Sequence, residues 1–428
     1  MACLSSLPAP QPVLDRPDPL RCGCESDGLL AVDAALARGL AMLPPPGPAE
    51  SVPLAQAIGR VLADPVRSPL PLPPFDNAAM DGYALRRADL TGDGPWCLPR
   101  RGRVRAGDAP GVLARASVCR ILTGAAIPQG ADTVIAQEAV VLEDGQIRIA
   151  QRPALGSHIR RAGEDLAIGA PILAAGRLIG AREMAALASV GCAFVAVRPR
   201  LRVAILATGS ELVEPGQPLG PGQIWNSNRF LLAAALDAPW IERIDLGALP
   251  DDPARLASAL SEIAGRVDLL VSTGGVSVGD EDHMVPAFER VGGTLHVMKL
   301  AMKPGKPLVL GRLGQAVWLG LPGNPVAAFT AWTVIGAPLA AAMAGLRAPG
   351  PRKQVVRLAH ALSHRPGRCE YRPARVLGHD GQGALRIACL DAPGSHRVAL
   401  LAEAEGLALI PAEVEALPAG ALVEYLPF

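Results

Sequence analysis

Between residues 201 and 344, short apolar runs alternate with stretches that have helical spacing. Strands are predicted at residues 201–206, 241–246, 267–272, 295–298, 308–310 and 316–319. Helices are predicted at residues 228–236, 253–264, 281–291 and 325–344. Continuous apolar runs are typical of strands that are covered on both faces, and their alternation with helices favours a mostly parallel sheet. We therefore predict an α/β domain with helices on both faces.

The regions before and after this domain have shorter strand-like runs. Residues 97–149 contain such runs separated by Gly, Asp and Pro, which predicts an all-β region. After Pro351, runs at 354–358, 369–376, 385–389, 397–401, 407–410 and 422–426 predict a small β domain or barrel. Helical spacing at residues 29–43, 54–63 and 181–190 predicts three short helices.

Composition narrows the class of protein. The 428 residues carry a formal net charge of +1, without a basic block, which argues against a nucleic-acid partner. The N-terminus lacks the basic and apolar regions of a signal peptide, and we interpret the scattered cysteines as free thiols in the cytoplasm. Residues 327–346 are long enough to span a bilayer, but they are Ala-rich and interrupted by Gly336 and Pro338, so we predict a buried helix and no membrane partner.

The most informative loop follows the strand predicted at 267–272. Gly274 and Gly275 permit positive φ and close approach of a ligand, and a helix N-terminus favours anions. Asp280, Glu281 and Asp282 would repel a phosphate unless Mg²⁺ lay between them. The loop therefore predicts a phosphate ligand held through a metal. The alternative is a plain strand-to-helix loop whose acids cap the helix.

Other polar residues fall into two groups, which are carboxylates in Gly-containing loops and cations on rigid loops. The first group includes Asp81, Asp165, Glu211 and Asp251, and the second Lys299, Lys303, Lys306 and Arg368. Solvated turns and a rigid domain crossing are the alternative interpretations. The chain has no G-x-S-x-G motif, and Gly305-Lys306 is followed by Pro rather than Ser or Thr, so it is not a Walker A motif. Metal-assisted chemistry on an anionic, phosphate-bearing substrate fits better than covalent hydrolysis.

Seven sequence blocks, in order, resemble the molybdopterin molybdenumtransferase family, which includes the C-terminal domain of gephyrin. They include PPFDNAAMDGYA, STGGVSVGDEDH, MKPGKP and GLPGNPVAA. The seven blocks lie at residues 73–84, 123–138, 160–173, 207–228, 272–283, 302–307 and 320–328. The resemblance extends from about residue 29 to the C-terminus.

The resemblance implies an α/β multidomain protein. Its parts would be a flexible extension (1–27), an elongated N-terminal domain (28–68 and 160–198), an inserted β-rich domain (69–159), a mostly parallel α/β molybdopterin-binding domain (199–349) and a C-terminal β-barrel (350–428). It also implies a homodimer in which the partner's inserted domain completes the cleft.

The implied activity is insertion of molybdenum from molybdate into adenylated molybdopterin. Hydrolysis of the adenylate would require Mg²⁺ and would release AMP. Further partners would be molybdopterin adenylyltransferase and molybdoenzyme maturation proteins. Two alternatives are a molybdopterin adenylyltransferase, which shares only the α/β domain, and a non-catalytic molybdopterin-binding or scaffold paralogue.

The resemblance also assigns roles to individual residues. The catalytic group is Asp81, Thr123, Asp165 and Glu211. The substrate-binding group is Gly274, Gly275, Ser277, Asp251, Lys299, Lys303, Lys306, Pro322, Pro325, Arg368 and Ser395, and the metal ligands are Asp251 and Asp282. The chain departs from the family pattern at three positions, because Ala78 replaces the usual Ser, Ser210 the usual Asp, and Ala327 a frequent Ser.

Overall fold

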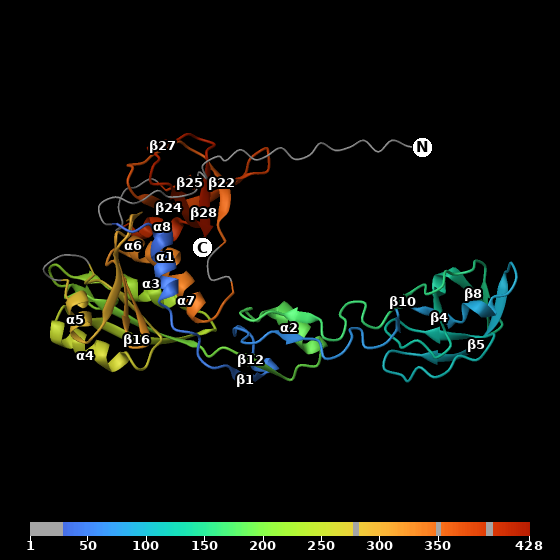
Figure 1. Ribbon diagram of the computed structural model, residues 1–428. Coiled ribbons are helices and arrows are strands. Elements are labelled where there is room, and N and C mark those ends of the chain that lie inside the picture. The colour runs from blue at the N-terminus through green and yellow to red at the C-terminus, as the bar shows by residue number, and fades with distance from the viewer. Residues whose placement is uncertain (1–28, 277–281, 348–351, 391–396) are drawn as a thin grey trace. The chain divides into compact units, whose positions relative to one another are not determined.

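The computed structural model describes residues 29–276, 282–347, 352–390 and 397–428, which form two compact units (Figure 1). The first unit holds the described residues up to Glu50, together with Gly59–Val61 and Arg198–Phe428. The second holds Ser51–Ile58 and Leu62–Val197. The extension predicted at residues 1–27 lies outside the described residues, and the finer domain limits stay predictions.

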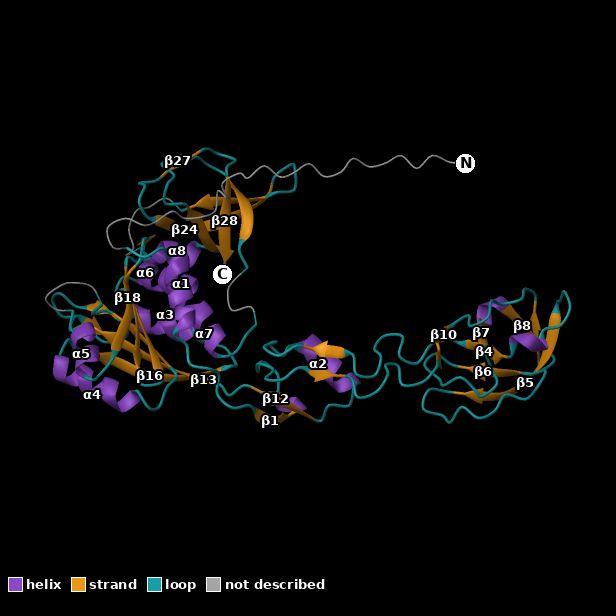
Figure 2. Ribbon diagram, in the orientation of Figure 1, coloured by secondary structure: helices purple, strands orange, loops and turns teal. Residues whose placement is uncertain are grey.

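A six-stranded sheet forms the centre of the first unit, in the order β16-β13-β17-β21-β20-β18 (Figure 2). Its strands are β13 (Leu201–Thr208), β16 (Ile241–Leu249), β17 (Leu269–Thr273), β18 (Thr294–Lys299), β20 (Pro307–Leu313) and β21 (Ala316–Leu321). The first four strands in this order run parallel, and the last two add antiparallel pairs. The prediction of a mostly parallel sheet is therefore confirmed.

Helices cover both faces of this sheet. They are α1 (Val32–Ala41), α3 (Ser227–Ala235), α4 (Pro253–Ile263), α5 (Met284–Arg290), α6 (Pro325–Ala331) and α7 (Ala337–Met343), with a π-helical turn, η4 (Trp332–Gly336), between the last two. On β13, Val203 and Ile205 face one core, and Ala204 and Leu206 face the other. Burial on both faces explains the continuous apolar run of this strand.

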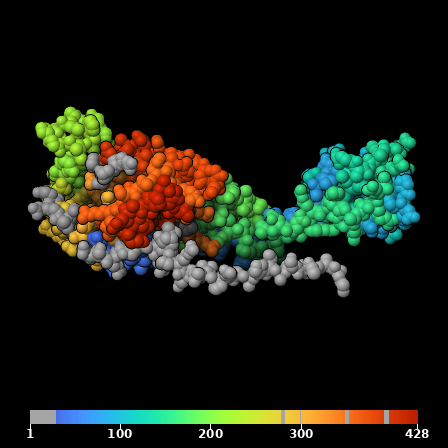
Figure 3. Space-filling view, turned by 90° about the horizontal axis from the view of Figure 1, so that it is seen from above, coloured from blue at the N-terminus to red at the C-terminus, as the bar shows by residue number. Residues whose placement is uncertain are grey.

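The C-terminal part of the first unit is a closed β-barrel. Its strands are β22 (Gln354–Leu358), β24 (Cys369–His379), β25 (Leu385–Cys389), β26 (Gly406–Ile410) and β28 (Leu422–Pro427), with short pairs at β23 (Leu362–Ser363) and β27 (Ala416–Leu417). The β24–β26 pairing closes the ring, and β19 (Met302–Lys303) joins it from the α/β domain. In the space-filling view these orange and red residues form a continuous body with the α/β domain (Figure 3).

One predicted strand of the barrel is instead a helix, α8 (Val398–Glu403). A short apolar run such as residues 397–401 fits a strand or a buried helix equally well by periodicity alone. Here the run packs against α6 and β24, and these tertiary contacts favour a helix over a strand.

The second unit contains a six-stranded sheet in the order β7-β4-β6-β5-β9-β8. Its strands are β4 (Gly82–Leu85), β5 (Trp96–Val104), β6 (Val118–Ile121), β7 (Thr133–Ala136), β8 (Val140–Glu143) and β9 (Gln146–Ile149). The rest of the unit is a series of two-stranded pairs made by the outgoing and returning chain. These pairs are β1 (Glu50–Pro53) with β12 (Phe194–Val197), β2 (Val66–Arg67) with β11 (Pro171–Leu173), and β3 (Asn77–Ala78) with β10 (Ile159–Arg160), beside α2 (Ala181–Ser189).

The helix predicted at residues 54–63 is wrong, because only the 3-10 turn Leu54–Gln56 forms. Gly59 stops any continuation, since it adopts φ +71°. An added Cβ at this glycine would lie 2.4 Å from Pro239 Cβ. Close packing therefore overrides the local helical spacing.

Two further predictions concern single segments. The helix Pro325–Met343 is long and apolar enough to cross a membrane by composition, but 72% of its most apolar window is buried within the protein. This burial agrees with a core helix. Cys97, Cys119 and Cys192 carry free thiols, whereas Cys369 is disulfide-bonded, so the prediction that all cysteines are free is wrong there. Scattered single cysteines offer no spacing from which such a bond could be predicted.

Gly274, directly after β17, illustrates how tightly the strand ends are packed. It has φ +92°, and its N–H donates to Leu321 O at 3.2 Å. An added Cβ would lie only 2.3 Å from Thr208 O at the end of β13. A neighbouring strand, and not only a ligand, therefore requires glycine at this position.

We expect Gly274→Ala to lower the free energy of unfolding by about 3 kcal/mol, because backbone strain and steric overlap add together. Gly292→Ala is the matched control, since Gly292 has φ +90° and no atom within 4 Å of an added Cβ. It should cost only about 1 kcal/mol. Denaturant unfolding followed by fluorescence measures both, and equal losses would contradict the packing argument.

Candidate active site

The predicted catalytic residues are divided between the two units. Asp81, Thr123 and Asp165 belong to the second unit, and Glu211 belongs to the first together with the described substrate-binding residues. Ser277 and Ser395 lie outside the described residues, as do Asp280 and Glu281. The geometry is therefore described for each unit separately.

Asp81 and Thr123 are brought together by neighbouring strands. Asp81 precedes β4 and Thr123 follows β6, and these strands pair antiparallel with Gly82 opposite Ile121. The Thr123 N–H and hydroxyl both donate to Asp81 Oδ1, at 2.8 and 2.7 Å. The N–H of Thr123, followed by its hydroxyl, holds the pKa of Asp81 below its usual range. Asp81 is therefore an ionised, oriented acceptor at neutral pH.

Arg120 completes this cluster and was missed by sequence reasoning. Its Nη2 lies 4.0 Å from Asp81 Oδ2, and its Nη1 donates to Gly82 O at 3.4 Å. Its guanidinium stacks over the Tyr83 ring, 5.2 Å from the centroid, which limits its motion. The available signal was a single arginine on an otherwise apolar strand three residues before Thr123.

Asp165 lies on the returning crossing of the second unit, apart from this pair. Its N–H donates to Leu72 O at 3.0 Å, and its carboxylate is exposed. Nearby, Arg161 Nη1 pairs with Asp76 Oδ2 at 2.6 Å. The Arg161 N–H donates to Glu164 Oε2 at 2.8 Å within its own segment. The Asp165–Leu72 and Arg161–Asp76 contacts join the outgoing and returning strands.

In the first unit, one group of predicted residues lies just beyond the carboxyl ends of the parallel strands, where ligands of such sheets bind. Glu211 follows β13, Asp251 follows β16, Gly274 follows β17 and Pro322 follows β21. The Ser210 N–H donates to Asp251 Oδ2 at 2.9 Å, and the Asp251 N–H donates to Ser210 Oγ at 3.2 Å. The Glu211 carboxylate folds over Gly209, where an added Cβ would lie 2.6 Å from Oε2. The acids of these loops are thus held in defined positions.

Asn228, a buried residue of α3, connects the end of β17 to the loop before α6. This residue was not singled out in the sequence. Its Nδ2 donates to Thr273 Oγ1 and to Gly323 O, both at 2.7 Å. The Thr273 hydroxyl in turn donates to Pro322 O at 3.2 Å. This buried network joins the end of β17 to the loop before α6. The signal was the second Asn of the block that ends at residue 228.

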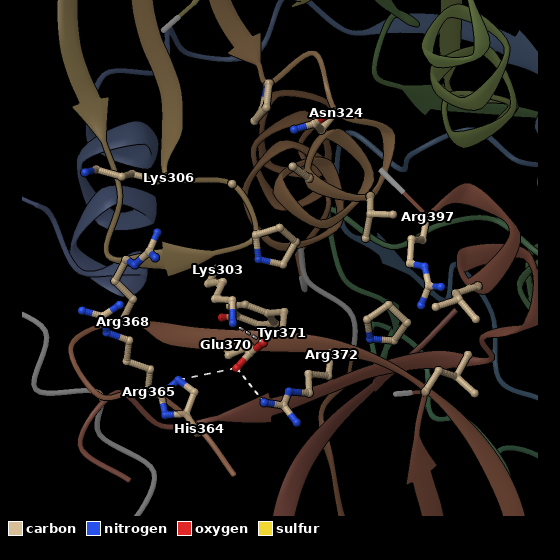
Figure 4. A pocket seen from close by; sticks show the side chains of 18 of the residues that line it. Lys303, Lys306, Asn324, His364, Arg365, Arg368, Glu370, Tyr371, Arg372 and Arg397 are labelled. Carbon is tan, nitrogen blue, oxygen red and sulfur yellow. Dashed lines mark hydrogen bonds and ion pairs between the residues drawn. The ribbon is translucent and has the colours of Figure 1, made fainter. Parts of the chain in front are cut away.

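A cavity of about 760 Å³ lies between this loop and the barrel (Figure 4). Its six cationic side chains are Lys303, Lys306, Arg365, Arg368, Arg372 and Arg397, and Glu370 is its one carboxylate among the described residues. Lys303, Lys306, Pro322 and Arg368 of the predicted set line it. The excess of positive charge favours binding of an anion in this cavity.

Glu370 organises the floor of the cavity. Lys303 Nζ lies 3.0 Å from its Oε1, and Arg372 Nη2 lies 3.0 Å from its Oε2. Burial raises the pKa of Glu370, but the hydrogen bonds from Arg372 and Lys303 outweigh burial and hold the pKa below its usual range. Sequence reasoning missed this residue, although it follows Arg368 by only two positions.

Three other predicted residues, Pro325, Lys299 and Asp282, do not line the cavity. Pro325 begins α6, and the preceding Asn324 makes no side-chain cap hydrogen bond but lines the cavity. Lys299 ends β18, is exposed and does not line the cavity. Asp282 precedes α5, which starts later than predicted, at Met284. Within the described parts of the chain, no three His, Cys, Asp or Glu side chains form a metal-binding group.

We expect Thr123→Val to raise the pKa of the Asp81 carboxyl while leaving it below its usual range. The hydroxyl bond is lost, but the backbone N–H, which is the larger cause, remains. Because the folded pKa is lowered, this bond stabilises the protein above the unfolded pKa and is lost as pH falls through the folded pKa. Carboxyl NMR titration measures the change. Asp108, whose pKa is lowered chiefly by the Arg105 N–H, should not change, and an unaltered Asp81 would contradict the assignment.

Family models match almost the whole described chain. The MoeA N-terminal region (domain I and II) matches residues 30–191, a probable molybdopterin binding domain matches 204–342, and the MoeA C-terminal region (domain IV) matches 355–428. Among solved structures, a molybdopterin biosynthesis MoeA protein from Pyrococcus horikoshii is 31% identical with a TM-score of 0.78, covering 93% of this chain and 99% of that one.

Curated relatives give the same result. The molybdopterin molybdenumtransferase of Haemophilus influenzae is 36% identical over 404 residues, which cover 94% of this chain and 99% of the relative. Molybdopterin molybdenumtransferase 2 of Mycobacterium tuberculosis is 39% identical over 381 residues, covering 86% and 93%. With a mostly parallel α/β domain, a closed C-terminal barrel and these matches along its length, the chain belongs to the molybdopterin molybdenumtransferase family, whose members are enzymes of molybdenum cofactor biosynthesis.

Proposed function

We propose that this enzyme inserts molybdenum from molybdate into adenylated molybdopterin and hydrolyses the adenylate, releasing AMP. The observation that carries the proposal is the loop Pro322-Gly323-Asn324. Pro322 and Asn324 line the cation-rich cavity, while the carbonyls of Pro322 and Gly323 bind the network at the end of β17. One loop therefore borders both an oxyanion cavity and the acid-bearing strand ends.

The cavity is the proposed molybdate site. Molybdate is a tetrahedral dianion, and ionised Lys and Arg donors bind such oxyanions more strongly than neutral donors. Arg368 and Lys306 supply fixed positive charge beside the Pro304-Gly305 turn, and Lys303 adds a lysine on a short strand that pairs with the barrel. Neighbouring Ala327 offers no hydroxyl, so charge rather than hydroxyl contacts would carry the affinity.

The strand ends are the proposed pterin phosphate site, with Mg²⁺ held by Asp251 and Asp282. Mg²⁺ keeps several waters and binds proteins through one or two carboxylates plus substrate phosphates, so two acids suffice without a larger cluster. The Ser210 N–H engages only Oδ2 of Asp251, which orients the carboxylate. When bound, Mg²⁺ would neutralise charge on the phosphate linkage. Thr208 and Met284 fill the space where their side chains would lie, so Gly274 and Gly275 would bind the phosphate through their backbone.

Asp81, Thr123, Asp165 and Glu211 are the proposed catalytic residues. Glu211 lies in the same group of loops as Asp251, and Thr123 orients the Asp81 carboxylate and lowers its pKa. We further propose a cytoplasmic homodimer in which the partner's inserted domain completes the cleft. The division of these residues between two compact units supports this proposal. Molybdopterin adenylyltransferase and molybdoenzyme maturation proteins are the proposed partners before and after this step.

We expect Glu211→Gln to lower molybdate-dependent AMP release by at least about 100-fold, because a positioned acid-base group contributes that much to a proton transfer. AMP release from adenylated molybdopterin is measured with Mg²⁺, with and without molybdate. The matched control is Glu214→Gln, which removes only the 2.6 Å ion pair with Arg229 and should keep most activity. Wild-type binding of the substrate without turnover would instead favour a non-catalytic molybdopterin-binding protein.

We expect Arg368→Ala to raise the molybdate concentration for half-maximal AMP release by roughly 10- to 100-fold, because it removes a charged donor from the cavity. The same assay measures this change over a molybdate series. Arg357→Ala, on the barrel, is the control, because Arg357 pairs with Asp380 and does not line the cavity. If both variants behave alike, the cavity is not the molybdate site.

A further inference from the structure

The cation-lined cavity contains an internal anion, the Glu370 carboxylate, that competes with any bound oxyanion. The Glu370 side chain is 8% exposed, and Lys303 and Arg372 are its cationic partners at 3.0 Å (Figure 4). A buried carboxylate that loses a partner is strongly destabilised. If Lys303 turns to an oxyanion, Glu370 keeps only Arg372, so another positive partner would favour that turn.

Lys303 is the partner that can move. Its side chain is 40% exposed, while that of Arg372 is 20% exposed. Arg372 Nη2 also donates to Ser363 O at 2.6 Å, which holds it in the barrel. A lysine ammonium on a flexible stem can redirect its hydrogen bonds, whereas a guanidinium bound on two sides cannot.

His364 lies behind this pair and can replace the lost charge. Its side chain is 1% exposed, and Nδ1 lies 2.6 Å from Val414 O. Because a carbonyl only accepts, Nδ1 carries a proton in either charge state of the ring. A second proton can therefore add only at Nε2. Within the described chain Nε2 is buried without a hydrogen-bond partner, and it lies 3.7 Å from Glu370 Oε2.

The charges around His364 determine when that proton is favoured. They come from β19 and β24, from its own loop and from the segment before β27, whose Glu415 carbonyl accepts the His364 N–H at 2.7 Å. The groups that line the cavity with His364 are Lys303, Glu370, Arg372, Arg365 and Arg368, while the Glu413 and Glu415 side chains of the segment before β27 are exposed. A dianion in the cavity, with Lys303 turned towards it, adds negative charge beside the ring and takes a cation away from Glu370.

We propose that oxyanion capture in this cavity is linked to proton uptake at His364 Nε2. The bound oxyanion takes Lys303 from Glu370 Oε1, and the imidazolium N–H, beside Oε2, compensates for the lost positive charge, with the proton coming from solvent. Glu370 and His364 are thus positioning residues that set how tightly, and at what pH, the anion is held. This inference rests on the proposed function, because it assigns a regulation to the proposed molybdate site.

The test is calorimetric titration of molybdate into the full chain in two buffers of different ionisation enthalpy. We expect uptake of roughly 0.5–1 proton per molybdate near neutral pH and an affinity that rises by about three- to tenfold for each unit that the pH falls. Binding without proton uptake would overturn the inference and leave the proposed site standing. No binding of molybdate by the wild type would overturn the proposed site itself.

The His364→Asn variant removes the site of proton uptake but can keep the hydrogen bond that holds this side chain in place. The Asn amide can keep the donor to Val414 O but has no counterpart of Nε2, so proton uptake should disappear and the affinity should become independent of pH. His379→Asn is the control, because His379 is exposed at the far end of β24 and does not line the cavity. Persistent uptake in His364→Asn would overturn the inference.

A second variant keeps the test decisive if His364→Asn does not fold. Glu370→Gln retains the shape of the side chain but removes the charge that Lys303 and a protonated His364 would share. Proton uptake should again disappear, and molybdate should bind more tightly because its internal competitor is gone. Unchanged uptake, or weaker binding by a folded Glu370→Gln variant, would contradict the proposal.

Discussion

The cavity depends on one short excursion of the backbone between β18 and β20. There the chain leaves the α/β sheet, and β19 pairs in parallel with β24 of the barrel, with Met302 opposite Cys369 and Lys303 opposite Glu370. Met302 is fully buried in a core that includes sheet residues and the barrel residues Tyr371 and Leu407. The same two residues thus join the domains through apolar burial and place a lysine beside a buried carboxylate.

This arrangement keeps opposite charges in separate places within one unit. The acids Glu211 and Asp251 stand at the ends of the parallel strands, and the cations stand over the barrel. The buried side chain of Asn228 holds the loop between them, since it binds both Thr273 and Gly323. Because a phosphate held through a metal needs acids and a free oxyanion needs cations, the two substrates would require such a separation.

The sequence predicted what depends on local pattern. The apolar run of β13 and its alternation with helices were sufficient for the parallel sheet, because the apolar residues Leu201 and Val203–Leu206 are buried on one or the other of its two faces. It failed at residues 397–401, where a helix and a strand are equally compatible with the run, and at Gly59, where Pro239 decides the backbone. Local spacing does not contain such contacts.

The same distinction separates the site residues that the sequence analysis found from those that it missed. Asp81 and Lys303 stood out because unusual turns and prolines surround them. Arg120 and Glu370 did not, since each looks like an ordinary charge on a strand until its partner is known. The ion pair between Lys303 and Glu370 joins two domains, and no periodicity connects them.

The three departures from the family pattern do not require loss of activity. Ala78 is fully buried in the core of the inserted sheet, and its N–H donates to Ala125 O. The backbone, and not a side-chain hydroxyl, therefore makes the hydrogen bond at this position. Ser210 keeps the loop closed through reciprocal bonds with Asp251, although it adds no charge. Ala327 lies in a cavity that retains six cationic side chains. Ala78 and Ala327 therefore leave the charged groups of the site in place. Ser210 removes one possible carboxylate ligand but keeps Asp251 oriented, and charge is what phosphate and molybdate recognition depends on.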